Sequence, residues 1–265
     1  MSLLGTMAHA IAPELMRARW LARKRSLEDE LTILPALTSH RMLSLDIGAN
    51  RGLYVEFLIP ISRRVVAFEP LRDMQEVLKK FYPDLQVEKV ALANKEGSAE
   101  IRLPRGNSGL ATLSSTNRLE RSTKEIVSQM VPTRTLDGYS FRDVGLIKID
   151  VEGFEDSVLE GAEETIRRER PNLLIEIEER HRAGAVHNTN SWASLRGYSG
   201  YFVDGPRLRS IDEFRLDSDQ PISNVFETGR RGRYINNFIF VARDRSAELE
   251  RFCNNLLALS RLPAR

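Results

Sequence analysis

Short apolar runs and helical spacings alternate along the chain from residue 42 onward. The apolar runs predict strands, in chain order, at MLSLDI (42–47), VVAFEP (65–70), LQVEKVAL (85–92), VGLIKIDVEG (144–153) and NLLIEIEE (172–179). After the second run, Met74, Val77, Leu78 and Phe81 recur with the spacing of one helix face, and Pro83 ends that pattern. The same spacing returns after the fourth run, at Val158, Leu159, Ala162 and Ile166. Strands that alternate with helices form βαβ units, so the pattern predicts an α/β fold with a mainly parallel sheet.

Four further stretches complete the predicted organisation. Residues 14–31 carry apolar side chains among many arginines, which indicates an amphipathic helix packed at the edge of the domain, with a membrane-surface role as the alternative. Residues 97–135 combine a short hairpin arm, SAEIRL, with the polar stretch RGNSGLATLSSTN, and a loop this long is usually functional or mobile. The pattern loosens through residues 181–233, where GYFVDG predicts one strand, and NNFIFVA (236–242) predicts the last.

Composition limits which partners the protein can bind and which cell compartment suits it. The 265 residues carry 39 Lys and Arg against 37 Asp and Glu, and a formal charge of +2 gives no broad basic surface for nucleic acid. The single cysteine, Cys253, excludes an internal disulfide framework and a Cys-rich zinc site, and it fits a reducing cytoplasm. No run reaches the roughly 18 apolar residues that a membrane span needs, and the first residues do not resemble a signal peptide. We expect a soluble, cytoplasmic protein with no nucleic-acid partner.

The first strand ends in a glycine-containing loop, LSLDIGANRGLY (43–54), whose details select its ligand. A dinucleotide loop follows G-x-G-x-x-G, but here Asn50 takes the place of the second glycine and Gly52 comes one residue early, which disfavours NAD. Asp46 would repel a diphosphate and attract an ammonium group such as that of S-adenosylmethionine (SAM). Glu69 follows 23 residues later, about the spacing at which an acid binds the hydroxyls of an adenosine ribose. The two acids therefore favour SAM as the ligand.

The run of motifs resembles the FkbM-type SAM-dependent methyltransferases. The shared segments, in order, are LDIGANRGLY, VVAFEP, VALANKEG, TLDGY, LIKIDVEGFEDSVLEGA and NLLIEIEERH, which together cover roughly residues 43–181. This resemblance implies a class I methyltransferase (Rossmann-like) fold, with a seven-stranded sheet, helices on both faces and an antiparallel last strand. It also implies methyl transfer to a hydroxyl, often on a sugar or a polyketide-like product. We expect an N-terminal helical appendage at 1–40, the methyltransferase domain at 41–245 and a C-terminal helix or tail at 246–265.

The resemblance also implies roles for individual residues. SAM-binding positions would be Asp46, Gly48, Ala49, Asn50 and Gly52 along the methionine part, Glu69 with Pro70 at the ribose, Ala91 and Leu92 near the adenine, and Asp150 beside the reacting centre. The candidate catalytic residues are Asp150, Glu152 and His181. We assign Asp150 to orient the acceptor and His181 to act as the base, since an unperturbed imidazole has a pKa of about 6.5. Residues 1–40 and 182–232 match no motif, and we expect substrate choice to lie there.

Each of these assignments has a purely structural alternative. The two glycines could serve only a tight turn, Glu69 could cap the next helix, and His181 could lie on the surface. Asp150 and Glu152 could be the N-cap and first-turn acids of the helix that follows them. Asp150, Glu152 and His181 could also bind a hard cation, but nothing in their spacing requires one, so no metal is predicted.

Three functions remain open on the sequence alone. The favoured one is an enzyme that transfers the methyl group of SAM to a hydroxyl of a small molecule, a sugar or a glycan. A non-catalytic SAM-binding or interaction module would keep the same loop and Glu69 but would need no acceptor pocket. An NAD-dependent oxidoreductase is the third, and it would prefer NAD to SAM.

Overall fold

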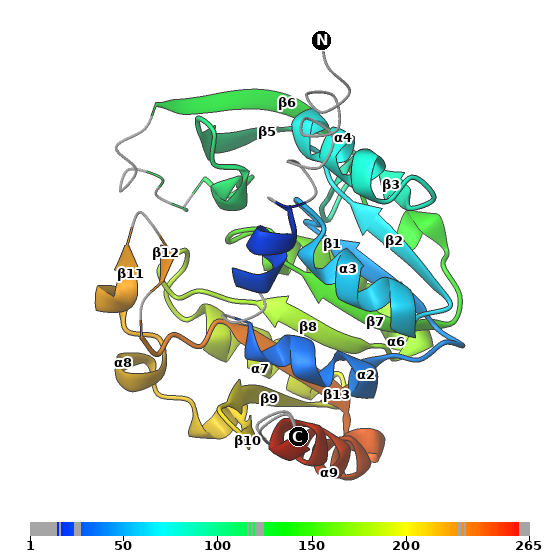
Figure 1. Ribbon diagram of the computed structural model, residues 1–265, viewed down its shortest axis with the longest axis vertical. Coiled ribbons are helices and arrows are strands. Elements are labelled where there is room, and N and C mark those ends of the chain that lie inside the picture. Colours follow the sequence, from blue (N-terminus) through cyan, green and yellow to red (C-terminus); the bar gives the residue numbers. More distant parts are fainter. Residues whose placement is uncertain are drawn as a thin grey trace, which may run out of the picture.

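A twisted sheet with helices on both faces forms the body of the protein (Figure 1). The computed structural model describes residues 15, 17–23, 28–115, 117, 119, 125–226, 229–230 and 232–259. The main sheet has eight strands in the order β10-β9-β13-β8-β7-β1-β2-β3. A three-stranded sheet, β4-β6-β5, projects from it, and β11 pairs with β12. Within the described residues, no helix is long and apolar enough to cross a membrane.

The parallel half of the main sheet contains the strands that the apolar runs predicted. These are β3 (Gln86–Glu88), β2 (Arg64–Phe68), β1 (Leu43–Ile47), β7 (Val144–Ile149) and β8 (Asn172–Glu176). Next to them, β13 (Asn237–Ala242) runs antiparallel between β8 and β9 (Tyr198–Asp204). This order and the antiparallel β13 confirm the predicted class I methyltransferase fold.

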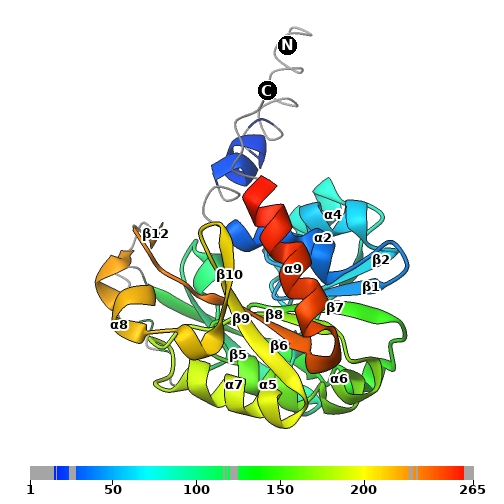
Figure 2. The ribbon, with the colours of Figure 1, turned by 90° about the horizontal axis from the view of Figure 1, so that it is seen from below.

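Helices pack on both faces and bury two separate sets of apolar side chains (Figure 2). One face is covered by α5 (Glu155–Glu160), α6 (Glu163–Glu169) and α7 (Ala185–Leu195). The other is covered by the 3₁₀ helix η1 (Asp29–Ile33), α2 (Leu34–Leu37), α3 (Leu53–Leu58), α4 (Arg72–Phe81) and α9 (Arg243–Leu259). The strands of the central sheet are buried on both sides because each face has its own helical layer.

The strand count is eight instead of the predicted seven. The additional strand is β10 (Arg207–Ser210), which pairs antiparallel with β9 across a turn at Gly205. Its sequence, RLRS, has no apolar pattern, so the sequence did not indicate it. The run LQVEKVAL is also divided, since β3 joins the main sheet while β4 (Ala91–Leu92) pairs with β6.

The segment from 97 to 135 contains more structure than its pattern predicted. The hairpin arm is present as β5 (Gly97–Pro104), and it pairs over its whole length with β6 (Ile126–Arg134). The β6 strand was not predicted because most of its side chains are exposed. The remaining short elements are α8 (Leu216–Asp219), β11 (Val225–Phe226) and β12 (Gly229–Arg230).

The predicted N-terminal helix lies partly within the described residues. Leu15 and residues 17–23 are helical, whereas 24–27 lie outside the description. Downstream, η1 and α2 bury Leu31, Ile33 and Leu34 against the same apolar cluster that contains Cys253 of α9. The two ends of the chain therefore contribute to one core layer, while the predicted domain limits stay predictions.

Candidate functional site

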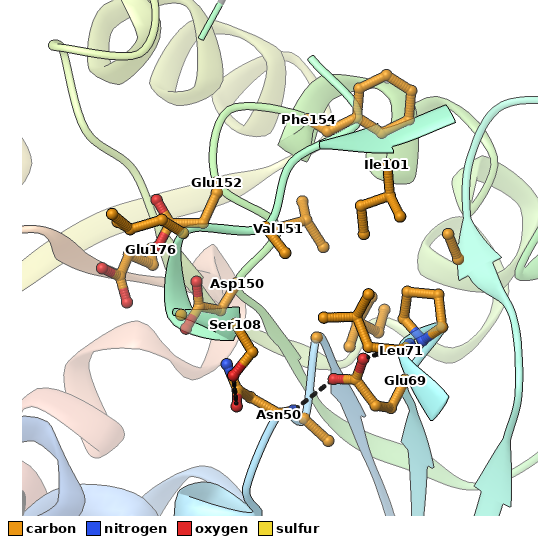
Figure 3. A pocket seen from close by; sticks show the side chains of 18 of the residues that line it. Asn50, Glu69, Leu71, Ile101, Ser108, Asp150, Val151, Glu152, Phe154 and Glu176 are labelled. Carbon is orange, nitrogen blue, oxygen red and sulfur yellow. Dashed lines mark hydrogen bonds between the residues drawn. The ribbon is translucent and has the colours of Figure 1, made fainter. Parts of the chain in front are cut away.

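A cavity of about 890 Å³ opens where the parallel strands end (Figure 3). The carboxyl ends of β1, β2, β7 and β8 supply most of its polar walls, as expected for ligand sites in open α/β sheets. Residues 106–111, from the segment after β5, form another wall, and Trp20 and Glu28 reach it from the N-terminal part. Figure 3 shows Asp150, Glu152 and Glu176 on one side and Leu71, Ile101 and Phe154 on the other.

The loop after β1 packs directly against the loop after β7. Gly48 has a φ of +81°, and a Cβ at this position would lie 1.9 Å from the carbonyl oxygen of Asp150. The N–H groups of Gly48 and Ala49 both donate to the carbonyl of Phe68 at the end of β2. Only glycine fits at position 48, because a side chain would push the two loops apart.

Asp46 is the most buried acid of the cavity wall. It is 2% exposed, and its Oδ2 atom has no hydrogen-bond partner among the residues that the structure describes. Burial raises its pKa to about 7, although the positive charge of Lys148 acts in the opposite direction. Lys148 is its register neighbour on β7, and the Lys148 ammonium group donates to Asn237 and to the carbonyl of Ile149. An unpaired buried carboxylate oxygen that faces a cavity is suited to bind a positively charged group.

Glu69, at the end of β2, is held in place by two backbone groups. The N–H of Asn50 donates to Oε2 at 2.7 Å, and the N–H of Leu71 donates to Oε1 at 2.8 Å. Burial raises the pKa of Glu69 to about 7, against the effect of these two hydrogen bonds. The carboxylate thus fixes the loop after β1 relative to β2 and still lines the cavity. Leu71 is the N-cap residue of α4 (Arg72–Phe81), so the Glu69 side chain bonds the residue before the first turn of that helix.

The wall beside Glu69 is apolar. It consists of Pro70, Leu71, Ala91, Leu92, Ile101 and Phe154. Ala91 and Leu92 form the short strand β4, so the split of the predicted third strand is what turns them toward the cavity. A flat apolar wall next to a carboxylate matches the two parts of a nucleoside, its base and its ribose.

The opposite end of the cavity contains four acids and one arginine. Glu152 follows β7 with a φ of +52°, and its carbonyl accepts hydrogen bonds from Thr112 and Asn117 at 2.7 Å each. Burial raises the pKa of Glu152 well above its usual value, and the negative charges of Asp150, Glu178 and Glu176 act in the same direction. The residue before α5 is Phe154, so neither Asp150 nor Glu152 caps that helix.

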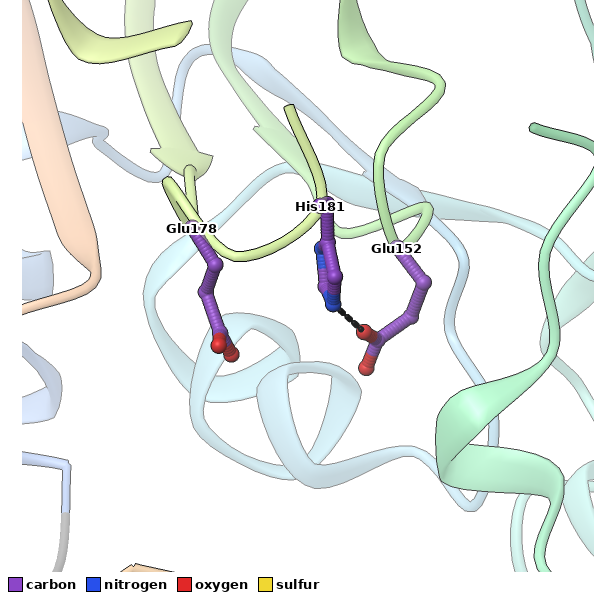
Figure 4. A group of neighbouring side chains, drawn as sticks. All are labelled: Glu152, Glu178 and His181. Atoms are coloured by element: carbon purple, nitrogen blue, oxygen red, sulfur yellow. Dashed lines mark ion pairs between the residues drawn. The ribbon is translucent and has the colours of Figure 1, made fainter. Parts of the chain in front are cut away.

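His181 lies behind Glu152 instead of on the surface (Figure 4). It is 6% exposed, and its Nε2 atom is 3.1 Å from Oε2 of Glu152, outside the geometry of a hydrogen bond. Burial lowers the pKa of His181 to about 4, and the positive charge of Arg180 adds to this effect. The imidazole is therefore neutral at pH 7. Arg180 bonds Glu178 through its Nε atom, and its Nη2 lies 3.5 Å from Oε2 of Glu152.

Comparison with known proteins identifies the family. The model of the Methyltransferase FkbM domain matches residues 46–201. The chain belongs to the FkbM methyltransferase family. A search of curated proteins gives no match.

Several solved structures are similar to the chain at low identity. The FkbM methyltransferase of Methylobacillus flagellatus KT is 20% identical with a TM-score of 0.48, over 76% of this chain and 44% of that chain. An rRNA methylase of Streptococcus thermophilus is 11% identical with a TM-score of 0.42, over 81% and 92%. A SAM-dependent methyltransferase of Leishmania major is 11% identical with a TM-score of 0.34, over 80% and 71%. The chain spans less than half the length of the Methylobacillus protein.

Family membership supports methyl transfer in general, and SAM is the donor that the family implies. The structure brings most of the predicted site residues to one cavity. The lining includes Asp46, Gly48, Ala49, Asn50, Glu69, Pro70, Ala91, Leu92, Asp150 and Glu152. Gly52 and His181 are not among the lining residues. Gly52, with a φ of +80°, packs against Leu78 and Tyr82, and a Cβ there would lie 2.8 Å from each.

Some lining residues were not identified as site residues from the sequence. Glu178 and Arg180 lie in the motif EIEERH, where only His181 was assigned a role. The polar stretch at 106–111 carried a signal in its length and composition, but no residue in it was singled out. Trp20 and Ile101 carried no such signal in the sequence. An aromatic residue on an amphipathic helix and an apolar residue on a strand usually belong to the core.

Proposed function

We propose that this protein transfers the methyl group of SAM to a hydroxyl group of a small molecule, a sugar or a glycan. One observation carries the proposal: the cavity has an unpaired buried carboxylate oxygen on Asp46 at one position and a second buried carboxylate, Glu69, beside an apolar wall. This is the set of groups that an amino-acid nucleoside requires.

The residues present fit SAM in three places. Asp46 would bind the ammonium group, since its Oδ2 has no other partner among the described residues. Glu69 would bind the ribose hydroxyls, because its oxygens retain lone pairs beyond the two backbone hydrogen bonds. Ala91 and Leu92 would contact the adenine. When bound, SAM supplies a methyl group on a positively charged sulfur.

The rest of the cavity supports an acceptor and thus an enzyme instead of a binding module. Beyond Asp150 the lining continues through Glu152, Glu176, Glu178 and Arg180. Carboxylates accept hydrogen bonds from hydroxyl groups, and a guanidinium donates hydrogen bonds to them. A module without turnover would need no second polar end of this kind.

Positioning of the acceptor and removal of its proton are the tasks left to the protein. A well-oriented pair of reactants gains most of its rate from proximity, and a placed base adds about 10²- to 10⁴-fold. Asp150, at the end of β7, would orient the hydroxyl. The base we propose is the pair of Glu152 and His181, in which Glu152 lines the cavity and takes the proton while the neutral imidazole lies 3.1 Å behind it. The raised pKa of Glu152 makes it a stronger base than an exposed carboxylate.

The test combines binding with turnover. Calorimetry with SAM and with its demethylated product should give micromolar affinity, and NAD should give no heat. Incubation with methyl-labelled SAM and a panel of glycan and polyketide acceptors should transfer label to a hydroxyl. Absence of SAM binding would overturn the proposal. Tight SAM binding without turnover on any acceptor would favour the non-catalytic module.

A further inference from the structure

Three side chains at the acceptor end lie side by side (Figure 4). Glu152 comes from the loop after β7, whereas Glu178 and His181 come from the segment after β8. One ligand atom from each, a carboxylate oxygen or a ring nitrogen, lies within 4.8 Å of the other two. Two ligands of one transition-metal ion at roughly 2.1 Å are at most about 4.2 Å apart, so small side-chain rotations suffice to close the set.

Two buried atoms of this group have no hydrogen-bond partner among the described residues. His181 is 6% exposed, and its Nε2 atom has no hydrogen-bond partner among the described residues. The same holds for Oε2 of Glu152, 3.1 Å away. Buried polar atoms are nearly always paired in proteins, so two neighbouring exceptions that face each other require an explanation. A cation between them would satisfy both.

The backbone holds these ligands in place before any ion arrives. Glu152 has a φ of +52°, which costs energy for a residue with a side chain, and Thr112 and Asn117 bond its carbonyl. The next residue, Gly153, passes so close to His181 that a Cβ on it would lie 3.0 Å from the Cβ of His181. Strained backbone that positions a side chain is typical of functional sites.

The local charge favours a cation. Asp150 and Glu176 lie near the two glutamates, and both raise the pKa of Glu152 through their negative charge. Arg180 is a positive group in contact with the cluster: it bonds Glu178 and lies 3.5 Å from Glu152. Tyr234 also donates to Glu178 at 2.8 Å. Among the described residues, Asp150, Glu176 and Arg180 line this end of the cavity together with Glu152 and Glu178. Carboxylates at this density are typical ligands of divalent cations.

We propose that Glu152, Glu178 and His181 bind one divalent transition-metal ion, such as Mn²⁺, at the acceptor end of the cavity. Carboxylates suit Mn²⁺ and an imidazole extends the choice to Zn²⁺ and Fe²⁺, while three protein ligands leave coordination positions open. What the ion does rests on the function proposed above: it would hold the acceptor hydroxyl and lower its pKa, so that Glu152 would act as a ligand instead of a base. The ligand set differs from the one considered in the sequence, since Glu178 replaces Asp150.

The test measures binding of the ion alone to the whole 265-residue chain. The protein is freed of metal with a chelator and dialysed, and MnCl₂ is titrated while free Mn²⁺ is followed by electron paramagnetic resonance. We expect one saturable site. His181→Gln and Glu178→Gln should each weaken it by roughly a hundredfold, since even changes outside the ligand set often cost 10- to 100-fold. The matched controls are His187→Gln and Glu163→Gln, both outside the cavity, which should bind Mn²⁺ as the wild type does.

Two results would overturn the site: no saturable binding in the wild type, or equal affinity in the wild type and both ligand variants. Calorimetry of SAM binding on the metal-free protein separates this proposal from the function. SAM binding without Mn²⁺ binding removes the metal and leaves Glu152 and His181 as the base. Saturable Mn²⁺ binding that His181→Gln abolishes, without SAM binding, supports the metal site and removes the methyl donor.

Discussion

Replacement of Asp46 by asparagine should have opposite effects on stability and on cofactor binding. The change keeps the shape of the side chain and removes its charge. In the free protein, Asp46 has a pKa of about 7 because it is buried, whereas the ordinary pKa of an exposed aspartate is 3.8. Folding therefore raises the pKa, so the ionised side chain destabilises the folded state, and this penalty grows as the pH rises from 4 to 7.

The size of the effect follows from that difference in pKa. One unit corresponds to 1.36 kcal/mol, so the penalty is about 0.5 kcal/mol at pH 4 and about 4 kcal/mol at pH 8. Asp46→Asn avoids it and should raise the free energy of unfolding by roughly 2 to 4 kcal/mol at pH 8, with little change at pH 4. The affinity for SAM should fall by about 1.5 to 3 kcal/mol, the usual loss for a hydrogen bond to a charged group.

Urea denaturation at both pH values and calorimetry with SAM measure the two effects. Asp84→Asn, on the exposed stretch between α4 and β3, is the matched control and should change neither quantity. A variant that is less stable than the wild type at pH 8 would contradict the assigned burial penalty. Unchanged SAM affinity would remove Asp46 from the cofactor site.

The remaining predictions concern the other parts of the cavity. Glu69→Ala should weaken SAM binding by about 1.5 to 3 kcal/mol, as a calorimetric titration will show, and an unaltered affinity would exclude the ribose role. The proposed ammonium site requires Asp46 in its ionised form, and the pKa of Asp46 is about 7. Wild-type affinity for SAM should therefore rise about tenfold from pH 6 to pH 8, and a flat profile would contradict this. Hydrogen exchange in the segment 105–135 should slow when SAM and acceptor bind, because residues 106–111 line the cavity, and equal protection in both states would show a fixed arm. Once an acceptor is known, His181→Ala should lower turnover with little effect on SAM affinity, whereas Asp150→Asn should also raise the acceptor KM. Full activity of His181→Ala from pH 6 to 9 would exclude His181 from proton removal.

The sequence predicted the parallel core because burial on both faces leaves a clear signal. Strands such as Leu43–Ile47 and Val144–Ile149 are buried throughout and mostly apolar. The buried face of the helix that contains Met74 and Leu78 repeats with the helical period. Strands β6 and β10 escaped prediction because exposed strands need no apolar pattern. Their existence depends on pairing partners that are distant or follow a turn, which local sequence does not encode.

The sequence likewise predicted some positions of the candidate site and not others. Asp46 and Glu69 were predictable because the ends of neighbouring parallel strands meet at one edge of the sheet. The position of His181 behind Glu152 was not, since it depends on the left-handed backbone of Glu152 and on the close passage of Gly153. The contribution of Trp20 depends on how the N-terminal helix packs, and no motif marks that contact.

The contact between Gly48 and Asp150 means that main-chain atoms set the distance between the loop after β1 and the loop after β7. The N–H of Asp150 donates to the carbonyl of Ile47 at 2.9 Å, and the carbonyl of Asp150 fills the space where a side chain of residue 48 would lie. The carboxyl ends of β1 and β7, where Asp46 and Asp150 lie, are thus held at a fixed spacing by main-chain contacts. Under the proposed function, substitutions beyond Asp150 would change the acceptor that fits the cavity without changing this spacing between the strand ends.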